Sequence, residues 1–351
     1  MNAMNISELF NNKIFRISDC QRGYSWGEEQ LNTLWNDIKE IELSDGKSRK
    51  HYLGTIILQE STAHPSESWL YEYSFYKVID GQQRLTTICI LLFELIKSAK
   101  MGFCERSTIN LYENYIAVSK FTGTSKVYKF GYGISDKNNS FLINSIFEDN
   151  RENLKNEQPY TIYLANLINA KSFFSNKLAQ LSIKEKESIF MKITSSLEVE
   201  LRIIEKDADI ISIIETINKR GKSLSRFENL RISLLYLIDK YSIEFEDKNH
   251  LRKTINDAWH IINLNLAQNP KLIFNQDEFL SDFLYQDLRT HQNIVTGKYT
   301  NDANEIIENP YTFDKINDFA VKMSKFSSIW VLNKSKKFQN KAAGVNSPEI
   351  P

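Results

Sequence analysis

The stretch VIDGQQRLTT, residues 78 to 87, places an acid, a glycine, two amides and an arginine just before a run with helical apolar spacing. Free backbone N–H groups at a helix N-terminus carry about half a positive charge and favour phosphate. Arg84 adds a guanidinium that can bind phosphate through two hydrogen bonds. An acid in the same turn would repel phosphate unless a cation lies between them, as Mg²⁺ does in nucleotide sites. The pattern is therefore consistent with a metal-nucleotide site in which Asp80 is the metal ligand.

A structural interpretation of the same residues stays open. Asp80 followed three residues later by Gln83 has the form of a capping box, in which side chains satisfy the first backbone groups of a helix. Gly81 supplies a backbone that can turn sharply and approach a ligand. A plain capping box with a solvated Gln82 explains the motif about as well as a phosphate site does.

A second cluster, FRISDCQRGYSW at residues 15 to 26, combines Gln21 and Arg22 with two large rings. Arg22 could contact phosphate, and Tyr24 or Trp26 could stack on a base, an interaction of about 1 to 3 kcal/mol. Aromatic residues that flank a helix start more often pack on the core. Taken alone, this segment favours packing over stacking.

A third cluster, ETINKRGKSLSRFENL, begins at residue 215. Gly221 and the two residues after it have the form of the end of a P-loop, but Thr216 stands where the first glycine is required. A helix that ends near Asn218, a left-handed Gly221 and a serine cap on the next helix form a simple corner. The polar groups around Asn218 would also suit a loop that faces a ligand.

Apolar spacing predicts the elements that position these residues. A helix is expected over residues 27 to 43, followed by a hairpin of two strands, HYLGTIILQE and WLYEYSFYKVI. The helix after Gly81 should bury a stripe formed by Leu85, Ile88, Leu92 and Leu95. The segment SSLEVELRIIEKD alternates apolar and polar residues, so a late strand can complete the same sheet.

The predicted fold class is α+β, with a small mixed sheet, a largely helical insertion and a helical C-terminal region. We expect the sheet domain to comprise residues 1–104 and 195–240, interrupted by the insertion at 105–194. A helical region is expected over 241–335, and a solvated tail over 336–351.

Composition limits the functions that this chain can have. Its 351 residues are 42% hydrophobic and 25% charged, which is ordinary for a soluble globular protein. Lys and Arg total 44, as do Asp and Glu, so any contact with DNA must come from a local basic surface. Three cysteines without CxxC spacing argue against a disulfide framework or a zinc site. With neither a leader pattern nor a long apolar run, we expect a cytoplasmic protein that contacts no membrane.

The motifs CQRGYSW, HYLGTIIL, VIDGQQRLTT and ETINKRGKSLS, in this order, resemble those of the GmrS-type proteins of modification-dependent restriction and phage defence. The resemblance covers roughly residues 5 to 240. It departs from the family pattern at Ser18 and Cys20, where proline and tyrosine are usual. The family's N-terminal domain resembles the ParB/sulfiredoxin fold, and this chain is expected to share that fold.

The resemblance implies binding and hydrolysis of a nucleoside triphosphate with Mg²⁺, coupled to cleavage of modified or phage DNA. The base stays open among GTP, UTP, CTP and ATP. Asp80, Gln83 and Arg84 are the expected catalytic residues, and Asp80 is the expected metal ligand. Binding of the nucleotide is expected from the remaining motif residues, which are Gln21, Arg22, Tyr24, Gly81, Gln82, Asn218 and Gly221.

Many relatives carry a His-Asn nuclease domain after the helical region. His250, His260 and His291 lie in helical patterns instead, so the nuclease is expected as a separate subunit or as a domain that this sequence lacks. Two alternatives stay open: a DNA-binding module that needs no nucleotide, and a metal-dependent nuclease in its own right. Homo-oligomer formation is also left open.

Overall fold

The computed structural model divides the chain into two compact units. Unit 1 comprises Met1–Gln158 and Tyr163–Ile217, and unit 2 comprises Pro159–Ile162 and Asn218–Pro351. The structure describes residues 3–19, 21–42, 50–99, 103, 107–120, 125–133, 136–148, 161–206, 208, 210, 213–214, 224–240, 245–268, 275–288 and 312–342.

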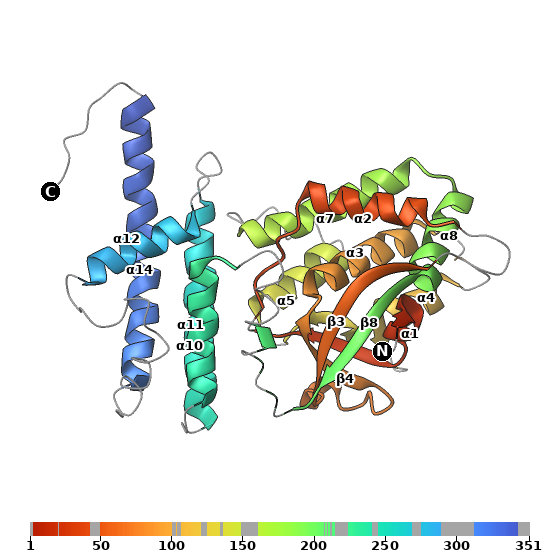
Figure 1. Cartoon of the computed structure of the whole chain (residues 1–351), viewed down its shortest axis with the longest axis horizontal. Helices are drawn as coiled ribbons and strands as arrows, with labels where there is room; N and C mark the ends of the chain where they lie inside the picture. Colours follow the sequence, from red (N-terminus) through yellow and green to blue (C-terminus); the bar gives the residue numbers. More distant parts are fainter. Residues whose placement is uncertain are drawn as a thin grey trace. The chain divides into compact units, whose positions relative to one another are not determined.

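A mixed six-stranded sheet forms the centre of unit 1 (Figure 1). In order across the sheet, its strands are β1 (Ala3–Asn5), β8 (Leu197–Ile204), β3 (His51–Ser61), β4 (Ser74–Asp80), β2 (Lys13–Ile17) and β7 (Phe130–Tyr132). β3 and β4 form the predicted antiparallel hairpin. β4 begins later than predicted, because residues 68–69 and 71–72 form turns after the short 3-10 helix Pro65–Glu67. β8 lies between β1 and β3, so the late strand completes the same sheet, as predicted. The α+β class is confirmed.

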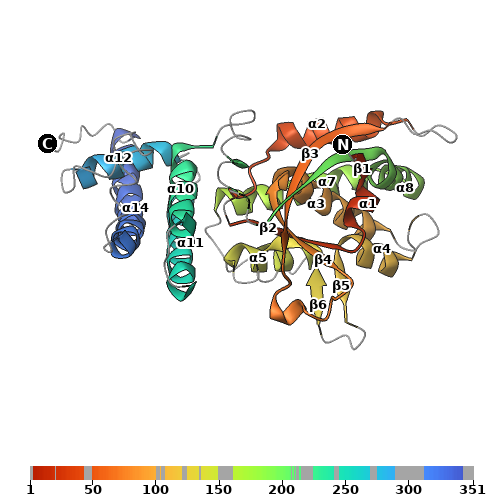
Figure 2. The same cartoon turned by 60° about the horizontal axis from the view of Figure 1, so that its bottom comes forward.

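Helix α3 (Gln82–Ser98) lies at the centre of unit 1, beside α2 (Glu28–Glu40) and α7 (Ile162–Ala179), as Figure 1 and Figure 2 show. The predicted stripe from Leu85 to Leu95 is buried. Burial extends around the whole helix, because every residue from Leu85 to Ile96 is buried. Trp35 of α2 packs on Phe174 of α7 with ring centroids 6.3 Å apart. The first turn of α3 is therefore fixed by a core that surrounds the rest of the helix.

The segment predicted as a helical insertion also contains strands. Its helices are α4 (Thr108–Tyr115), α5 (Lys137–Phe141), the π-helix η2 (Leu142–Phe147), α7, α8 (Ile183–Met191) and the π-helix η3 (Lys192–Ser196). Strands β5 (Ala117–Ser119) and β6 (Lys126–Tyr128) pair with each other, and β7 joins the main sheet beside β2. The largely helical description is confirmed. The three strands were not predicted, because strands of three residues are too short to show an alternating pattern.

The N-terminal end of the chain packs against the same sheet. Helix α1 (Ile6–Phe10) begins with a capping box formed by Asn5 and Glu8. On β2, Ile14 joins Leu70, Phe75 and Val127 in a small apolar cluster. This cluster includes β6, so the insertion and the sheet share part of one core.

Unit 2 consists of helices α10 (Arg226–Lys240), α11 (Phe245–Ala267), α12 (Gln276–Leu288) and α14 (Thr312–Ala342) over its described residues. Figure 1 and Figure 2 both show α12 crossing α14. α10 packs on α11 and α12, and α11 packs along α14. α14 continues to Ala342, past residue 336, where a solvated tail was expected. Within the described part of the chain, no helix is long and apolar enough to cross a membrane.

Candidate functional site

Two β-bulges lie beside the DGQQR motif. Their backbone carbonyl groups accept hydrogen bonds from Arg84 of this motif and from Gln21 of the CQRGYSW segment. Opposite β8, the register of β3 shifts between Tyr52 and Gly54, which leaves Leu53 without a partner in the ladder. Opposite β3, the register of β4 skips Ile79, the residue before Asp80. The carbonyl of Leu53 accepts from Arg84 Nη1 at 3.2 Å, and that of Ile79 accepts from Gln21 Nε2. Bulges of this kind are frequent beside functional sites, because they redirect backbone groups.

Gly81 is the N-cap of α3 and has a left-handed backbone, with φ 90° and ψ 7°. A Cβ at this position would lie 3.0 Å from Ile56 Cγ1, so β3 packs directly against the turn. No side chain caps the helix. The predicted capping box is therefore wrong: the left-handed glycine takes the cap position that Asp80 was expected to hold, and Gln83 reaches elsewhere.

Arg84 lies over the bulge in β3, where Gly54 makes room for it. Gly54 has φ 115°, and a Cβ there would lie 1.9 Å from Arg84 Nη1. Arg84 Nη2 lies 3.5 Å from a carboxylate oxygen of Asp80, the last residue of β4. The side chains of Arg84 and Asp80 are 23% and 31% exposed, so both can meet a ligand from solvent. Partial exposure leaves Arg84 accessible, and its predicted catalytic role stays a prediction.

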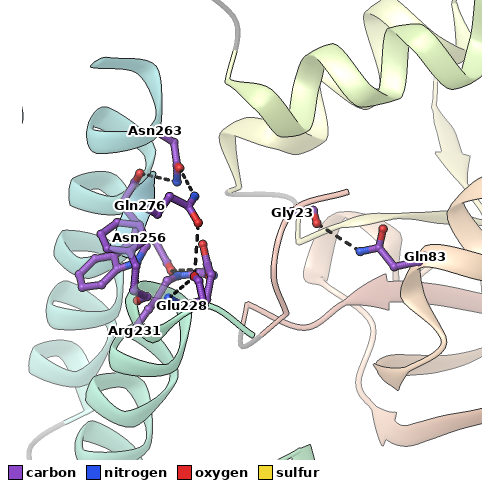
Figure 3. Close-up of polar contacts among 10 residues, drawn as sticks. Gly23, Gln83, Glu228, Arg231, Asn256, Asn263 and Gln276 are labelled. Atoms are coloured by element: carbon purple, nitrogen blue, oxygen red, sulfur yellow. Dashed lines mark hydrogen bonds and ion pairs between the residues drawn. The ribbon is translucent and has the colours of Figure 1, made fainter. Parts of the chain in front are cut away.

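Gln83 holds the loop of residues 21 to 26 against α3. Its amide donates to the carbonyl of Gly23 at 3.2 Å, as Figure 3 shows, and accepts from the backbone N–H of Ser25 at 2.8 Å. The amide of Asn166 on α7 donates to the carbonyl of Tyr24 in the same loop. Because both atoms of the Gln83 amide bind this loop, the geometry favours a positioning role over direct catalysis.

The aromatic residue at the centre of this loop belongs to the core. Tyr24 is fully buried, and its hydroxyl lies 2.8 Å from Thr87 Oγ1 on α3. Burial raises the pKa of Tyr24, which keeps the hydroxyl neutral. The ring is not accessible to a base, so packing replaces the stacking role considered for Tyr24. Trp26, by contrast, is only partly buried.

Gln82 is the second residue of the motif's amide pair, and its surroundings differ from those of Gln83. The side chain is 2% exposed, and neither Oε1 nor Nε2 has a hydrogen-bond partner. A buried polar group without a partner costs about 1 to 3 kcal/mol, and such groups are rare in native structures. Gln82 is the first residue of α3, so this unpaired amide lies at the helix N-terminus.

The polar side chains near this turn differ in what they can bind. Arg22 is partly buried and makes no hydrogen bond or ion pair with the described residues. Within the described ranges, no group of three or more His, Cys, Asp or Glu side chains is placed to hold a metal ion. Cys89, farther along α3, is buried, and burial raises the pKa of its thiol. Asp80 is thus the carboxylate that this turn offers to a cation.

The structure brings together most of the residues that were predicted to form one site. Gln21, Asp80, Gly81, Gln82, Gln83 and Arg84 gather at the end of β4 and the start of α3. Asn218 and Gly221 lie outside the described residues, as does Cys20, so their proposed places near the site stay predictions.

Three supporting residues were not predicted as part of the site: Gly23, Leu53 and Gly54. A Cβ on Gly23 would lie 2.2 Å from Tyr163 Cγ, so this glycine lets the loop approach α7 closely. Gly54 had a signal in the sequence, because a glycine inside a strand pattern indicates a bulge or a close approach. Leu53 gave no signal, since its role depends on its backbone carbonyl.

The fold and the site together define an α+β protein. A left-handed glycine turn leads into a helix N-terminus that has no side-chain cap and has an arginine beside it. The model of the N-terminal domain of the GmrSD restriction endonuclease matches residues 6–236. This match covers more than half of the 351 residues, and the chain belongs to the GmrSD family of restriction and phage-defence proteins. It includes β8 and most of α10. No curated protein gives a significant match.

Proposed function

We propose that the chain binds and hydrolyses a nucleoside triphosphate at the N-terminus of α3, as a regulatory component of a DNA restriction system. The observation that carries this proposal is the unpaired, buried amide of Gln82 beside a helix N-terminus without a side-chain cap. Unpaired buried polar groups in native proteins call for an explanation, and a ligand that binds at the same turn supplies one.

Phosphate is the ligand chemistry that this turn supports best. The backbone N–H groups of the first turn of α3 point away from the helix and bear a partial positive charge. Arg84 adds a fixed cation, which the carbonyl of Leu53 holds at 3.2 Å. A rotation of the Gln82 side chain toward the turn would replace an unpaired buried state with hydrogen bonds to phosphate oxygens. Ligand binding would thereby recover part of the cost of burying the amide.

Mg²⁺ fits this site as part of a metal-nucleotide complex. Mg²⁺ usually binds one or two protein carboxylates and completes its six ligands with water and phosphate oxygens. Asp80 supplies one partly exposed carboxylate, 3.5 Å from Arg84. One carboxylate is the minimum that this mode of Mg²⁺ binding needs. The ion would neutralise phosphate charge, while Asp80 and Arg84 hold the nucleotide in place. Gln83 and Gln21 would keep the surrounding loop and strand end in position.

Thermal unfolding with GTP, UTP, CTP and ATP, each with and without Mg²⁺, tests the proposal. A ligand that binds only the folded protein raises the midpoint of unfolding. We expect at least one nucleotide to raise it in the presence of Mg²⁺, and phosphate release to follow for the same nucleotide. The proposal fails if no nucleotide changes the midpoint.

Two variants and one control locate the binding at this turn. Arg84→Ala removes the cation, and Gly54→Ala adds a Cβ where the guanidinium lies. Both should reduce the nucleotide-dependent shift while the protein stays folded. Arg202→Ala is the matched control, because Arg202 is an exposed arginine of β8 that pairs with Glu200. An equal shift in the Arg84 variant and the control would place the nucleotide elsewhere.

The nuclease is proposed to act as a separate chain or domain. Pure protein should therefore leave modified DNA uncut with Mg²⁺ and nucleotide. DNA binding that nucleotides do not change would favour the alternative of a nucleotide-independent module. Metal-dependent nicking by this chain alone would favour the second alternative, a nuclease in its own right.

A further inference from the structure

The second half of α14 is strongly basic, although the chain as a whole has no net charge. Residues 321 to 342 include six lysines and no acidic residue, whereas basic and acidic residues number 44 each in the whole sequence. This stretch lies beyond residue 236, where the match to the family model ends. Its charge therefore needs an explanation separate from the site at α3.

The lysines of this stretch differ in what they contact. Lys334 pairs with Glu278 and with Asp282 at 3.2 Å, and its ammonium lies 5.1 Å from the centre of the Trp330 ring. Lys322, Lys325 and Lys336 are exposed, and their side-chain ammonium groups make no ion pair or hydrogen bond with any residue that the structure describes. One lysine thus helps to pack α12 on α14, and three lysines face solvent.

The helix dipole does not account for the first two of these exposed lysines. Its effect falls off within the last turn of a helix. Lys322 and Lys325 lie more than four turns before Ala342, at 3.6 residues a turn. Their charge is therefore not a device for stabilising the end of α14.

The exposed lysines share one face of α14 with two apolar residues. Lys322, Lys325, Ile329, Leu332 and Lys336 follow one another at steps of three and four residues, which keeps them on one side of a helix. We call these five residues the lysine stripe. Ile329 and Leu332 are 57% and 55% exposed and occupy its centre. The stripe extends about 21 Å along the helix at 1.5 Å per residue.

The lysine stripe is separate from the face that packs in unit 2. Ala320, Met323 and Ser327 are fully buried, and Trp330 and Val331 are nearly so. These residues lie on the side of α14 opposite the stripe, given 100° per residue. Ser327 also accepts a hydrogen bond from Asn265 of α11 at 2.8 Å. A partner can therefore occupy the stripe without disturbing the contacts of α14 with its neighbours.

We propose that the lysine stripe is a binding surface for duplex DNA. Phosphate groups are the partner that unpaired lysines fit best, because binding releases the counterions condensed on DNA. The major groove is about 12 Å wide and admits an α-helix, with apolar side chains able to contact thymine methyl groups. Lysines at both ends of the stripe would bind the two phosphate backbones, and Ile329 and Leu332 would face base edges.

Other partners fit the lysine stripe less well. A helix that lies on a membrane surface presents a large apolar face, and this stripe contributes two apolar residues. Protein interfaces are depleted in lysine, which makes three exposed lysines around so small an apolar centre a poor protein-binding surface. The inference takes from the proposed function only the expectation that DNA is a partner. It does not depend on nucleotide binding or hydrolysis at α3.

Fluorescence anisotropy of a labelled duplex with the full chain, without nucleotide and at several salt concentrations, tests the proposal. The triple variant Lys322→Gln, Lys325→Gln, Lys336→Gln should weaken binding at least tenfold at low salt. Its slope of log affinity against log salt should fall by about 2 to 3, because each phosphate neutralised by a lysine contributes about 0.9 to the slope. The matched control Lys77→Gln, Lys120→Gln, Lys184→Gln removes three exposed lysines of unit 1 and should leave both quantities nearly unchanged.

Further measurements keep the result open to contradiction. The double variant Ile329→Ala, Leu332→Ala should reduce discrimination between duplex sequences and leave the salt slope unchanged. An equal loss in the stripe variant and the lysine control would overturn the proposal. So would unchanged DNA binding with loss of binding to vesicles of three parts phosphatidylcholine and one part phosphatidylserine. The stripe variant should still show the nucleotide-dependent rise in unfolding midpoint. Failure of the DNA-binding proposal is therefore distinguishable from failure of the nucleotide-binding proposal.

Discussion

Two polar clusters, one in each unit, differ in how completely their groups are paired. In unit 2, Arg231 of α10 donates to Asn256 of α11 at 3.0 Å and pairs with Glu228 at 3.4 Å. Gln276 donates to Asn263 at 2.8 Å and accepts from Ser225 at 3.3 Å, which completes a set that we call the α10 cluster (Figure 3). Each of these side chains has a partner, either within α10 or on a neighbouring helix or turn.

The turn at the start of α3 is organised differently. Both polar atoms of the Gln83 amide have a partner, but the amide of Gln82 has none. The contact between Asp80 and Arg84 is long, at 3.5 Å. Burial is similar in the two places, since Glu228 is 3% exposed and Gln82 is 2% exposed. Burial of a polar residue therefore does not distinguish a structural role from a ligand-binding role. Whether the chain itself satisfies the buried group does distinguish them.

The largest expected effect comes from opening the α10 cluster. Glu228→Ala should destabilise the protein by about 3 to 5 kcal/mol, because it removes a carboxylate that pairs with the largely buried Arg231 at 3.4 Å. The free energy of unfolding from urea titration measures the effect. Glu278→Gln is the control, because Glu278 is an exposed partner of Lys334 and its loss should cost less than about 1 kcal/mol. Equal effects of the two changes would contradict a structural role for the α10 cluster.

A second prediction concerns a buried cation whose partners are carbonyl groups. Lys129 is 3% exposed, and its ammonium donates to the carbonyls of Phe10 at 3.1 Å and Asn114 at 2.8 Å. Burial lowers the pKa of Lys129 to about 8 from 10.5. Between these two pH values the unfolded chain binds more protons than the folded protein, so this lysine makes stability rise with pH.

The rise from pH 8 to pH 10 should reach about 2 to 3 kcal/mol, at 1.36 kcal/mol for each pKa unit. Below pH 8 the lysine is protonated in both states, and its contribution is constant. Urea titrations at pH 7, 8, 9 and 10 should show this rise in the natural protein and its loss in Lys129→Met. The exposed Lys120→Met is the control and should keep it. The variant could instead show the same rise in unfolding free energy with pH. That result would mean that, in the natural protein, the two carbonyl partners of the Lys129 ammonium offset the cost of its burial.

Much of the fold was predictable, because its main elements carry strong periodic patterns. Leu197 and Val199 alternate with polar residues and are fully buried on β8, as their spacing indicated, whereas Ile203 at the same spacing is 48% exposed. The strands of the insertion were missed, since β5, β6 and β7 have three residues each. For elements this short, pairing with a neighbour decides the conformation more than local pattern does.

The candidate site was predictable in its residues but not in its geometry. A motif of an acid, a glycine and two amides fits both a capping box and a phosphate site. The choice depends on the left-handed backbone of Gly81 and on the bulge at Leu53. Both arise from the register of strands that are distant in the sequence. Whether the amides of Gln82 and Gln83 find hydrogen-bond partners also depends on tertiary contacts. The sequence alone could therefore not distinguish the roles of these two adjacent glutamines.

The third prediction distinguishes an acid used for chemistry from one used for structure. Asp80 does not cap α3, and its contact with Arg84 is long, so Asp80→Asn should change stability by only a few tenths of a kcal/mol. If Asp80 holds Mg²⁺ or orients the attacking water, nucleotide hydrolysis should fall at least tenfold, which is about 1.4 kcal/mol of transition-state stabilisation.

Phosphate release at saturating nucleotide, measured together with the unfolding midpoint, checks this expectation. Glu200→Gln is a matched control, because Glu200 is a paired carboxylate on β8 whose pKa is lowered chiefly by its hydrogen bond with Arg202. Natural turnover in the Asp80 variant would show that its charge serves only to hold Arg84.

The smallest expected change in stability tests the comparison between the clusters most directly. Gln82→Leu replaces an unpaired buried amide with an apolar side chain of similar size, so it should leave stability unchanged or raise it by about 1 kcal/mol. The same substitution removes the group proposed to turn toward phosphate, and the nucleotide-dependent shift in the unfolding midpoint should fall. Gln276→Leu in the α10 cluster is the control with the opposite sign. It removes the donor to Asn263 Oδ1 and the acceptor of the Ser225 hydroxyl, and should destabilise by about 1 to 3 kcal/mol. A Gln82 variant that loses stability as the Gln276 variant does would show that the Gln82 amide has a structural partner in solution. The proposed nucleotide site would then lose the observation that carries it.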